Sequence, residues 1–429
     1  MSLKISLFNR TFFRSDIKRY WGIGLAQTLL IFVFSVLPVY TSCNGVMSGS
    51  LEWGYDCSPR WSFAFLTILP FAVGIISKLF NYIHTGASAG VIHGLPIRRG
   101  TLFSTKLISA AMILSLPILI NAGIMFFMST SFEFSAFLST KAVGEWLFEG
   151  IVYTMLFVSL TMVVSMMTGS SAATLIFSFG FLILPAVLIL FVQNIMDVEI
   201  YGYVYEYKDW LSKTYVSFKQ EAQNERLIVY AIVSFIFIFL AYWLYKKRKL
   251  EVSGEILAFT WLKPAFIGIV AFFGSIFGYG CFAGILNKTG ILWVMPLGVA
   301  SIIAAVMIEK KKFTFRGLLI PVIVYSVCAL GITAVVEFDL TGFERKIPEV
   351  AEVETVNVSF STGTEDIFFR EEDILDVIDV HKYFISQKDV KKGTDTILIS
   401  YNLKNDEVIK REYNIDINTD MEILDNIIK

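Results

Sequence analysis

The chain has 429 residues, of which 55% are hydrophobic and 15% aromatic, and its mean hydropathy of +0.65 excludes an ordinary soluble protein of this size. The net charge of −1 hides an asymmetry, because the residues from Glu337 onward carry 22 acids and 11 bases, whereas the first 336 residues carry 15 acids and 25 bases. A basic membrane part therefore carries an acidic tail, and nothing in this balance indicates a nucleic-acid partner.

The N-terminal residues 3–20 mix apolar side chains with five bases, which is typical of a helix that lies in the membrane interface among lipid headgroups. We therefore expect residues 1–20 to form an interfacial amphipathic helix. The apolar stretch Trp21–Tyr40 that follows is too long for a cleavable signal peptide and lacks a small-residue cleavage site. The first span is accordingly expected to be an uncleaved anchor.

Nine apolar stretches have about the 18–23 residues that a bilayer core requires. They are residues 21–40, 61–83, 107–128, 147–167, 173–195, 227–245, 262–285, 291–308 and 317–336. With the N-terminus inside, the inner segments hold 17 Lys and Arg residues and the outer loops hold seven. The sequence thus predicts a polytopic α-helical membrane protein of about nine transmembrane helices, with the N-terminus in the cytoplasm. This orientation depends on a tight turn at 168–172 between the fourth and fifth spans.

The inner stretch His84–Ser109 lies between the second and third spans and is too polar to be a further span. Gly86, Gly90 and Gly94 are spaced four residues apart, so one face of a helix here would be smooth enough for close backbone contact. The stretch is therefore expected to present a surface for a partner.

Pro96 predicts the start of a second helix, because its fixed φ and missing N–H suit a first helical turn. From that start Arg99, Leu102 and Lys106 would share one face of a short basic helix that lies under the membrane and runs into the third span. The alternative interpretation is that Arg98, Arg99 and Lys106 only hold the loop on the inner side.

The pattern Leu95-Pro96-Ile97-x-Arg99, with Lys106 seven residues later at the mouth of an apolar helix, resembles the first coupling element of type-2 ABC exporter permeases. In that family the loop rests on a separate ATP-binding subunit and passes its motion to the membrane helices. Arg98 departs from the pattern, since the family more often has a small hydroxyl residue there. The resemblance implies a second contact at 168–172 and a set of coupling residues, namely Gly90, Leu95, Pro96, Arg98, Arg99, Leu102 and Lys106.

Three polar residues inside spans, Gln27, Asn121 and Gln193, mark a candidate translocation path, because hydrocarbon leaves them unpaired unless a cavity or neighbour serves them. Cys43 and Cys57 both fall in the first outer loop, where a disulfide closing the loop is expected. The outer segment 196–226 is rich in Tyr, which fits either anchoring in the interface or contact with a substrate.

The tail 337–429 reads as a small α/β domain, which the orientation places outside the cell. Periodicity predicts strands at Val356–Phe360, Thr396–Leu403 and Glu407–Ile415, an amphipathic helix at Glu371–Ser386 and a closing helix at Asp420–Ile428. His381, on the inner face of the first helix, is expected to be packed or hydrogen-bonded. The tail resembles the extracytoplasmic domain of some Gram-positive, Ytr-like type-2 permeases in the His381-Lys382 and Arg411-x-Tyr413 neighbourhoods.

Motifs for chemistry within the chain are missing from the sequence. It contains no GxxxxGK[ST] loop for phosphates, no HExxH and no GxSxG, and its three histidines lie in separate segments. We therefore expect the chain itself to be no enzyme and to bind no cofactor, with ATP and Mg²⁺ held by the partner subunit that the resemblance implies.

The expected organisation is an interfacial helix (1–20), a six-span permease core (21–250), three added spans (251–336) and the outer domain (337–429). The resemblance implies a permease subunit of a bacterial cell-membrane ABC transporter that exports a peptide, a drug or a lipid-like compound. A second permease subunit, identical or related, would complete it. The alternative is a non-transporting polytopic sensor or immunity protein whose tail binds an extracellular peptide.

The bias of basic residues generates a test of orientation. In intact cells the variant Ser386→Cys is expected to react with a membrane-impermeant maleimide, because the tail would lie outside. Labelling that occurs only after lysis would place the tail in the cytoplasm and contradict the orientation.

Overall fold

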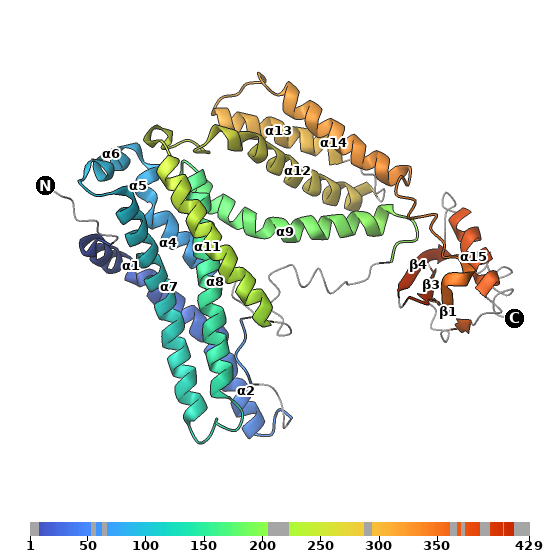
Figure 1. Ribbon diagram of the computed structural model, residues 1–429, viewed down its shortest axis with the longest axis horizontal. Coiled ribbons are helices and arrows are strands. Elements are labelled where there is room, and N and C mark those ends of the chain that lie inside the picture. The colour runs from blue at the N-terminus through green and yellow to red at the C-terminus, as the bar shows by residue number, and fades with distance from the viewer. Residues whose placement is uncertain are drawn as a thin grey trace. The chain divides into compact units, whose positions relative to one another are not determined.

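The computed structural model describes residues 8–52, 57–61, 67–204, 223–286, 294–360, 367–369, 374–386, 395–405 and 407–415 (Figure 1). The chain divides into two compact units. The first comprises residues 1–184 and 216–263, and the second comprises 185–215 and 264–429. The boundary at Leu184/Pro185 falls inside one continuous helix.

The first unit is a helical bundle. Its elements are α1 (Arg10–Ile31), the π-helix η1 (Phe32–Val36), α2 (Leu37–Met47), α4 (Leu69–Leu79), α5 (Asn81–His84), α6 (Gly86–Gly94), α7 (Arg99–Thr130), α8 (Thr140–Met167), the first half of α9 (Ser171–Glu199), α11 (Gln223–Lys247) and the short 3₁₀ turns η2 (Leu250–Val252) and η3 (Thr260–Leu262). Helix α8 is central, since it packs against α4, α7 and α11, while α1 packs along α7 (Figure 1). Accordingly, 72% of the most apolar stretch of α8 is buried, against 44% for α7 and 22% for α11.

The second unit includes three apolar helices, α12 (Lys263–Leu286), α13 (Val294–Lys310) and α14 (Leu319–Glu337). They approach closely because glycines replace side chains at the contacts. A Cβ on Gly274 would collide with the Ser301 side chain, and one on Gly298 would collide with the ring of Tyr325. Tyr325 also shares a hydrogen bond of 2.6 Å with Ser275, which joins α14 to α12.

Seven helices among the described residues are long and apolar enough to cross a membrane, which supports a polytopic helical membrane protein. They lie in 10–47, 99–130, 140–167, 171–193, 226–247, 260–280 and 319–337. Two of the nine predicted spans are shorter in the structure, since α4 has 11 residues and α13 has 17. Both predicted spans also include residues outside the described ranges.

The predicted boundary at residue 20 does not coincide with a helix end. Helix α1 begins after Asn9, whose side chain accepts hydrogen bonds from the N–H groups of Thr11 (3.0 Å) and Phe12 (3.2 Å). From Arg10 the helix runs through η1 into α2, as one apolar helix of 38 residues. The basic N-terminal segment from Arg10 onward and the first predicted span therefore form one continuous helix.

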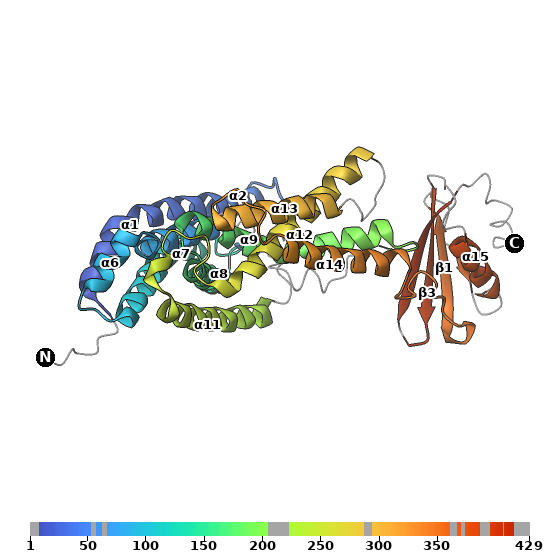
Figure 2. The same cartoon turned by 90° about the horizontal axis from the view of Figure 1, so that it is seen from above.

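The C-terminal domain is a four-stranded antiparallel sheet in the order β2-β1-β3-β4, with α15 across one face (Figure 2). Its elements are β1 (Val353–Phe360), β2 (Ile367–Phe369), α15 (Ile374–Ser386), β3 (Asp395–Leu403) and β4 (Val408–Ile415). The predicted three strands and amphipathic helix are confirmed, because period-2 and helical patterns each place one apolar face on this core. The short β2 was not predicted, and the expected closing helix lies outside the described residues.

A buried ion pair joins the start of α1 to the start of α7. The Lys106 ammonium lies 2.7 Å from Asp16, and both side chains are more than nine-tenths buried. The Ser109 hydroxyl donates to the second carboxylate oxygen at 3.2 Å, and the Asn9 N–H donates to the Thr105 hydroxyl at 3.0 Å. Every polar group of this contact is thereby paired, as burial of a charge requires.

We expect Lys106→Met to destabilise the chain strongly, because it leaves the Asp16 carboxylate buried without its cation. Breaking one side of a buried pair typically costs roughly 3–5 kcal/mol. The measurement is thermal unfolding in detergent, followed by tryptophan fluorescence. The double variant Asp16→Asn/Lys106→Met should recover much of the loss, because it removes both charges.

The exposed pair Lys141–Glu145, at 3.6 Å, supplies the matched control. Lys141→Met should cost no more than about 1 kcal/mol, because solvent screens an exposed pair. Equal unfolding temperatures for Lys106→Met and Lys141→Met would contradict the structural role of the buried pair.

Candidate functional site

The inner stretch folds as a short helix, a turn and a long helix. Helix α6 ends at Gly94, Leu95 and Arg98 have extended backbone, and α7 begins at Arg99. The prediction that a helix starts at Pro96 is therefore wrong by three residues. The N–H of Ile97 donates to the carbonyl of Leu95 at 2.7 Å, so Pro96 lies at the centre of a three-residue turn and not in a helical turn.

One side of this stretch is open to solvent or to a partner. Val91 is 69% exposed and Leu95 is 40% exposed. A Cβ added to each glycine of α6 would meet no atom within 4 Å, so the smooth glycine face packs against no described part of the chain. We call this the α6 surface and define it by Gly86, Gly90, Val91, Gly94, Leu95, Pro96 and Arg98.

The predicted basic face of α7 is not part of that surface. Leu102 is buried in the core of the first unit, and Lys106 is paired with Asp16. Arg99 is half-buried, and its guanidinium donates to the carbonyls of Lys246 (3.4 Å) and Arg248 (3.3 Å) at the end of α11. The prediction that these three residues face an ATP-binding partner is therefore corrected, because each has an acceptor or packing neighbour within the chain.

A buried arginine lies directly beneath α6. Arg248 is 5% exposed and donates to four backbone carbonyls. Three belong to the end of α8, and the fourth is the carbonyl of Ile83, in α5, at 3.1 Å. Burial lowers the pKa of Arg248 to about 10, so the group stays charged at neutral pH. The guanidinium therefore caps the C-terminal ends of two helices, where a cation also meets the favourable end of the helix dipole.

His84 lies beside this arginine and is 6% exposed. Its Nε2 lies 3.2 Å from the Ser165 hydroxyl and 3.3 Å from the Thr174 hydroxyl, and Thr174 contacts Thr168 at 2.6 Å. Burial, reinforced by the charge of Arg248, lowers the pKa of His84 to about 3, so the imidazole is neutral under physiological conditions. We call His84, Ser165, Thr168, Thr174 and Arg248 the inner node. It joins α5, α8, α9 and the end of α11.

The turn at 168–172, predicted as a second docking site, is largely covered by the chain itself. The N–H of Gly169 donates to the carbonyl of Ile256 at 3.2 Å, and the N–H of Gly254 donates to the carbonyl of Gly169 at 2.7 Å. Thr168 is fully buried, and of this turn only Ala172 is exposed. The backbone groups that end α8 are paired with residues 254–258, and docking at this turn stays a prediction.

The three candidate path residues occupy different settings. Gln27 is fully buried, and its amide has no hydrogen-bond partner among the described residues. Asn121 donates to the carbonyl of Thr28 at 3.2 Å, so it links α7 to α1. Gln193 is half-buried on α9, in the second unit. The translocation path therefore stays a prediction.

Cys43 and Cys57 are both buried. The disulfide expected between them stays a prediction.

Part of the tyrosine-rich outer segment packs on the C-terminal domain. The Tyr201 hydroxyl donates to the carbonyl of Phe384 at 3.0 Å, and its ring centroid lies 5.1 Å from that of Tyr413. Its N–H donates to the Glu344 carboxylate at 2.9 Å. Tyr201 is thus a packing residue, while positions 205–222 of this segment lie outside the described residues.

His381 confirms the expectation of a packed, hydrogen-bonded histidine. Its two ring nitrogens lie 2.9 Å from the Tyr401 hydroxyl and 2.7 Å from the Tyr413 hydroxyl. Burial and the nearby Arg411 lower the pKa of His381 to about 4, so the ring is a neutral member of the core of the domain.

No protein-family model matches the sequence, and comparison with curated proteins and with solved structures returns no match. The functional argument therefore rests on the geometry of the chain. Sequence reasoning identified the α6 surface but missed the inner node. Arg248 was read as one more inner base, because its partners are backbone carbonyls, which no residue pattern reveals.

The inner node predicts a pH dependence of stability. Folded His84 has a pKa of about 3, below the ordinary value of 6.5, so the unfolded chain binds more protons between these values. Its contribution to stability is therefore full above pH 6.5 and falls with pH, by at most about 1.4 kcal/mol per pH unit. His84→Gln should weaken the dependence of the unfolding midpoint on pH between about pH 6.5 and 5. Identical slopes for both proteins would refute a buried neutral His84.

Proposed function

We propose that the chain is the membrane subunit of an ABC exporter and that a separate ATP-binding subunit docks on the α6 surface. The observation that carries the proposal is the exposure of Val91 and Leu95 beside the exposed base Arg98, on a segment that belongs to none of the membrane-length helices. Apolar residues rimmed by charge on such a segment are typical of a protein interface. The open glycine face of α6 adds a smooth surface for close backbone contact.

The inner node supports this proposal, because its hydrogen bonds fix the end of α5, from which α6 continues. Helix α5 leads directly into α6, and the carbonyl of Ile83 in α5 is held by the same guanidinium that caps α8. The Ser253 hydroxyl also donates to the Ile83 carbonyl at 3.3 Å. Helix α6 itself packs against η2. A displacement of α6 by a docked subunit would therefore act on the ends of α8 and α11 through contiguous hydrogen bonds.

The remaining parts of the proposal come from the sequence. Inner bases favour a cytoplasmic N-terminus and an extracytoplasmic C-terminal domain in a bacterial cell membrane. The resemblance at Leu95–Arg99 favours a second permease subunit, identical or related, and ATP with Mg²⁺ in the docked subunit. The transported compound would be a peptide, a drug or a lipid-like molecule.

The second candidate function is a non-transporting sensor or immunity protein, and one contact favours it. Tyr201 packs into the C-terminal domain immediately after α9. A peptide that binds and shifts this domain would thus act directly on a membrane helix. Co-purification with an ATP-binding subunit favours the exporter, whereas peptide binding by a chain that has no such partner favours the sensor.

Gly90→Leu tests the docking surface. The leucine would enter open space, so the chain should insert and fold normally. Against a docked subunit it would overpack a tight contact, which typically costs roughly 1–3 kcal/mol and should weaken binding about 5- to 150-fold. The measurement is the affinity of the nanodisc-embedded chain for the ATP-binding subunit that co-purifies with the wild type, together with stimulated ATP hydrolysis.

The matched control is Gly123→Leu on α7, an exposed helical glycine that also has open space around it. This variant should bind and stimulate as the wild type does. Absence of any co-purifying ATP-binding subunit, or equal behaviour of the two glycine variants, would overturn the proposed docking surface.

A further inference from the structure

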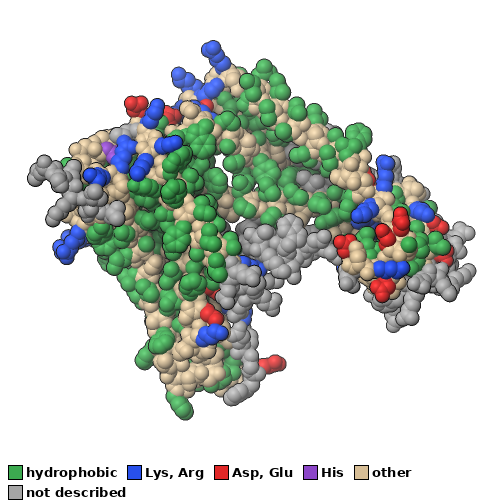
Figure 3. Space-filling view, in the orientation of Figure 1, with side chains coloured by type: hydrophobic (Ala, Val, Ile, Leu, Met, Phe, Trp, Pro, Cys, Tyr) green, Lys and Arg blue, Asp and Glu red, His purple; other side chains and the backbone are tan. Residues whose placement is uncertain are grey.

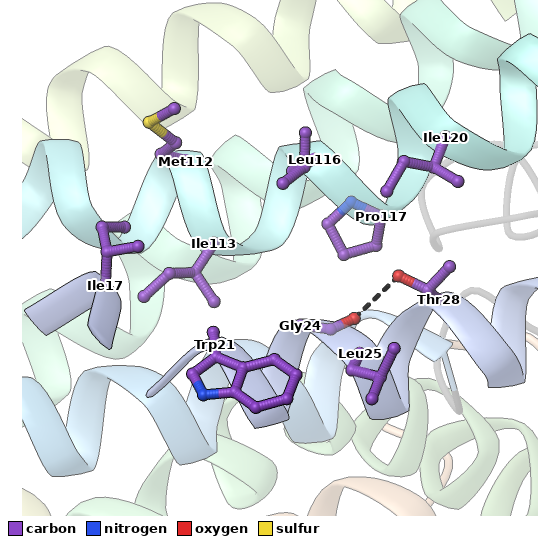
Figure 4. A pocket seen from close by; sticks show the side chains of 10 residues that line it. All are labelled: Ile17, Trp21, Gly24, Leu25, Thr28, Met112, Ile113, Leu116, Pro117 and Ile120. Carbon is purple, nitrogen blue, oxygen red and sulfur yellow. Dashed lines mark hydrogen bonds between the residues drawn. The ribbon is translucent and has the colours of Figure 1, made fainter. Parts of the chain in front are cut away.

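Helices α1 and α7 enclose an apolar groove along their outer flank (Figure 4). Its volume is about 220 Å³, and it is lined by Ile17, Trp21, Gly24, Leu25, Thr28, Met112, Ile113, Leu116, Pro117 and Ile120. The only hydroxyl among these side chains, that of Thr28, donates to the carbonyl of Gly24 at 2.8 Å. The groove therefore offers mainly hydrocarbon contact, and its one other side-chain polar group is the indole N–H of Trp21.

Gly24 forms the floor of the groove. A Cβ at this position would lie 3.0 Å from the carbonyl oxygen of Ile113, so the helices touch here. Several lining side chains are exposed, with Trp21 at 62% and Leu116 at 50%, whereas Ile113 is 5% exposed. Figure 4 shows these side chains of α1 and α7 facing one another along the two helices.

The length of the groove matches one leaflet of a bilayer. From Ile17 to Thr28 helix α1 rises by about 17 Å at 1.5 Å per residue. Half of the hydrocarbon core of a bilayer is about 15 Å thick. A single acyl chain lying along α1 would fill this length. A second copy of the chain would instead bring a membrane-length helix, which needs contact over both leaflets.

The end of the groove near Ile17 carries a stripe of uncompensated positive charge. Arg10, Arg14 and Lys18 follow each other at four-residue intervals, on the same face of α1 as Ile17 and Trp21. All three bases are exposed, and none has an ion-pair partner among the described residues. The only acid of α1 is Asp16, which is buried against Lys106. Figure 3 shows Lys and Arg side chains gathered at this end of the first unit and hydrophobic side chains along its flanks.

We propose that this groove binds one anionic phospholipid. Its acyl chain lies between α1 and α7, and its phosphate headgroup lies against Arg10, Arg14 and Lys18. Trp21 lines the groove about one helical turn beyond Ile17, near the headgroup end, where an indole ring is favourable in a membrane. Basic side chains at a membrane surface favour anionic over zwitterionic headgroups, which sets the selectivity. The site is independent of the proposed docking on α6 and of ATP-driven export.

The test is native mass spectrometry of the full chain in detergent, titrated with phosphatidylglycerol or with phosphatidylcholine of the same acyl chains. We expect one phosphatidylglycerol per chain to bind, with an affinity at least fivefold higher than that of phosphatidylcholine. A fivefold difference is about the contribution of a single basic side chain to the binding of an anionic lipid. Arg14→Gln should weaken phosphatidylglycerol binding about fivefold. Leu116→Trp should weaken it further by filling the groove. Because Leu116 is half-exposed, an unchanged unfolding temperature in lipid-free detergent would verify that this variant is folded.

Arg19→Gln is the matched control, since Arg19 is exposed on the same helix but lies about 140° around the axis from Arg14. It should leave binding unchanged. Three results would overturn the proposal: equal binding of the two lipids, equal effects of the two arginine variants, or no effect of Leu116→Trp. A disulfide between two copies of Leu25→Cys in native membranes would also overturn it, because a second chain would then occupy the groove.

Discussion

The carbonyl groups that end a helix have no partner within that helix, and a membrane protein cannot leave them bare near its apolar interior. In the first unit one guanidinium meets this requirement at the C-terminal ends of two helices. Arg248 donates to the carbonyls of Ser165, Met166 and Thr168 in α8 and to that of Ile83 in α5. The positions of α6, of the start of α9 and of the segment after α11 all depend on this convergence. Removing the guanidinium would take a hydrogen-bond donor from four backbone carbonyls at once.

Two of the inner bases thus act within the fold. Lys106 closes the contact between α1 and α7 through Asp16, and Arg248 closes the contact between α5, α8 and α11. Both residues also belong to the uneven distribution of Lys and Arg that predicts the orientation of the chain. A single basic residue can therefore contribute to topology and also form a buried ion pair or hydrogen bonds. Among the bases that remain exposed, Arg98 on the α6 surface and Arg10, Arg14 and Lys18 on α1 are the ones that the two proposals assign to partners. Burial is what separates these two roles.

Local periodicity predicted much of the fold and little of the site. The strands and helix of the C-terminal domain follow from alternation in Thr396–Leu403 and from the helical face of Glu371–Ser386. The start of α7 was misplaced because Pro96 lies in a three-residue turn, closed by the N–H of Ile97 and the carbonyl of Leu95, and not in a first helical turn. Lys106 was assigned to the surface because its partner, Asp16, lies 90 residues earlier, and no local pattern shows such a pairing. The inner node was missed because its acceptors are main-chain atoms.

The packing of Tyr201 changes where the C-terminal domain begins. The aromatic cluster of Tyr201 and Tyr413 contains a residue that precedes the four helices α11 to α14, and Gly202, at φ +74°, has no room for a Cβ beside the Tyr413 ring. During synthesis the Ile200–Tyr203 strap leaves the ribosome long before β4 does, and α11 to α14 are made in between. The core of the domain can therefore form only when the already synthesised residues 200–203 and the later strands lie on the same side of the membrane. A fragment cut at residue 337 would lack one of its own core side chains.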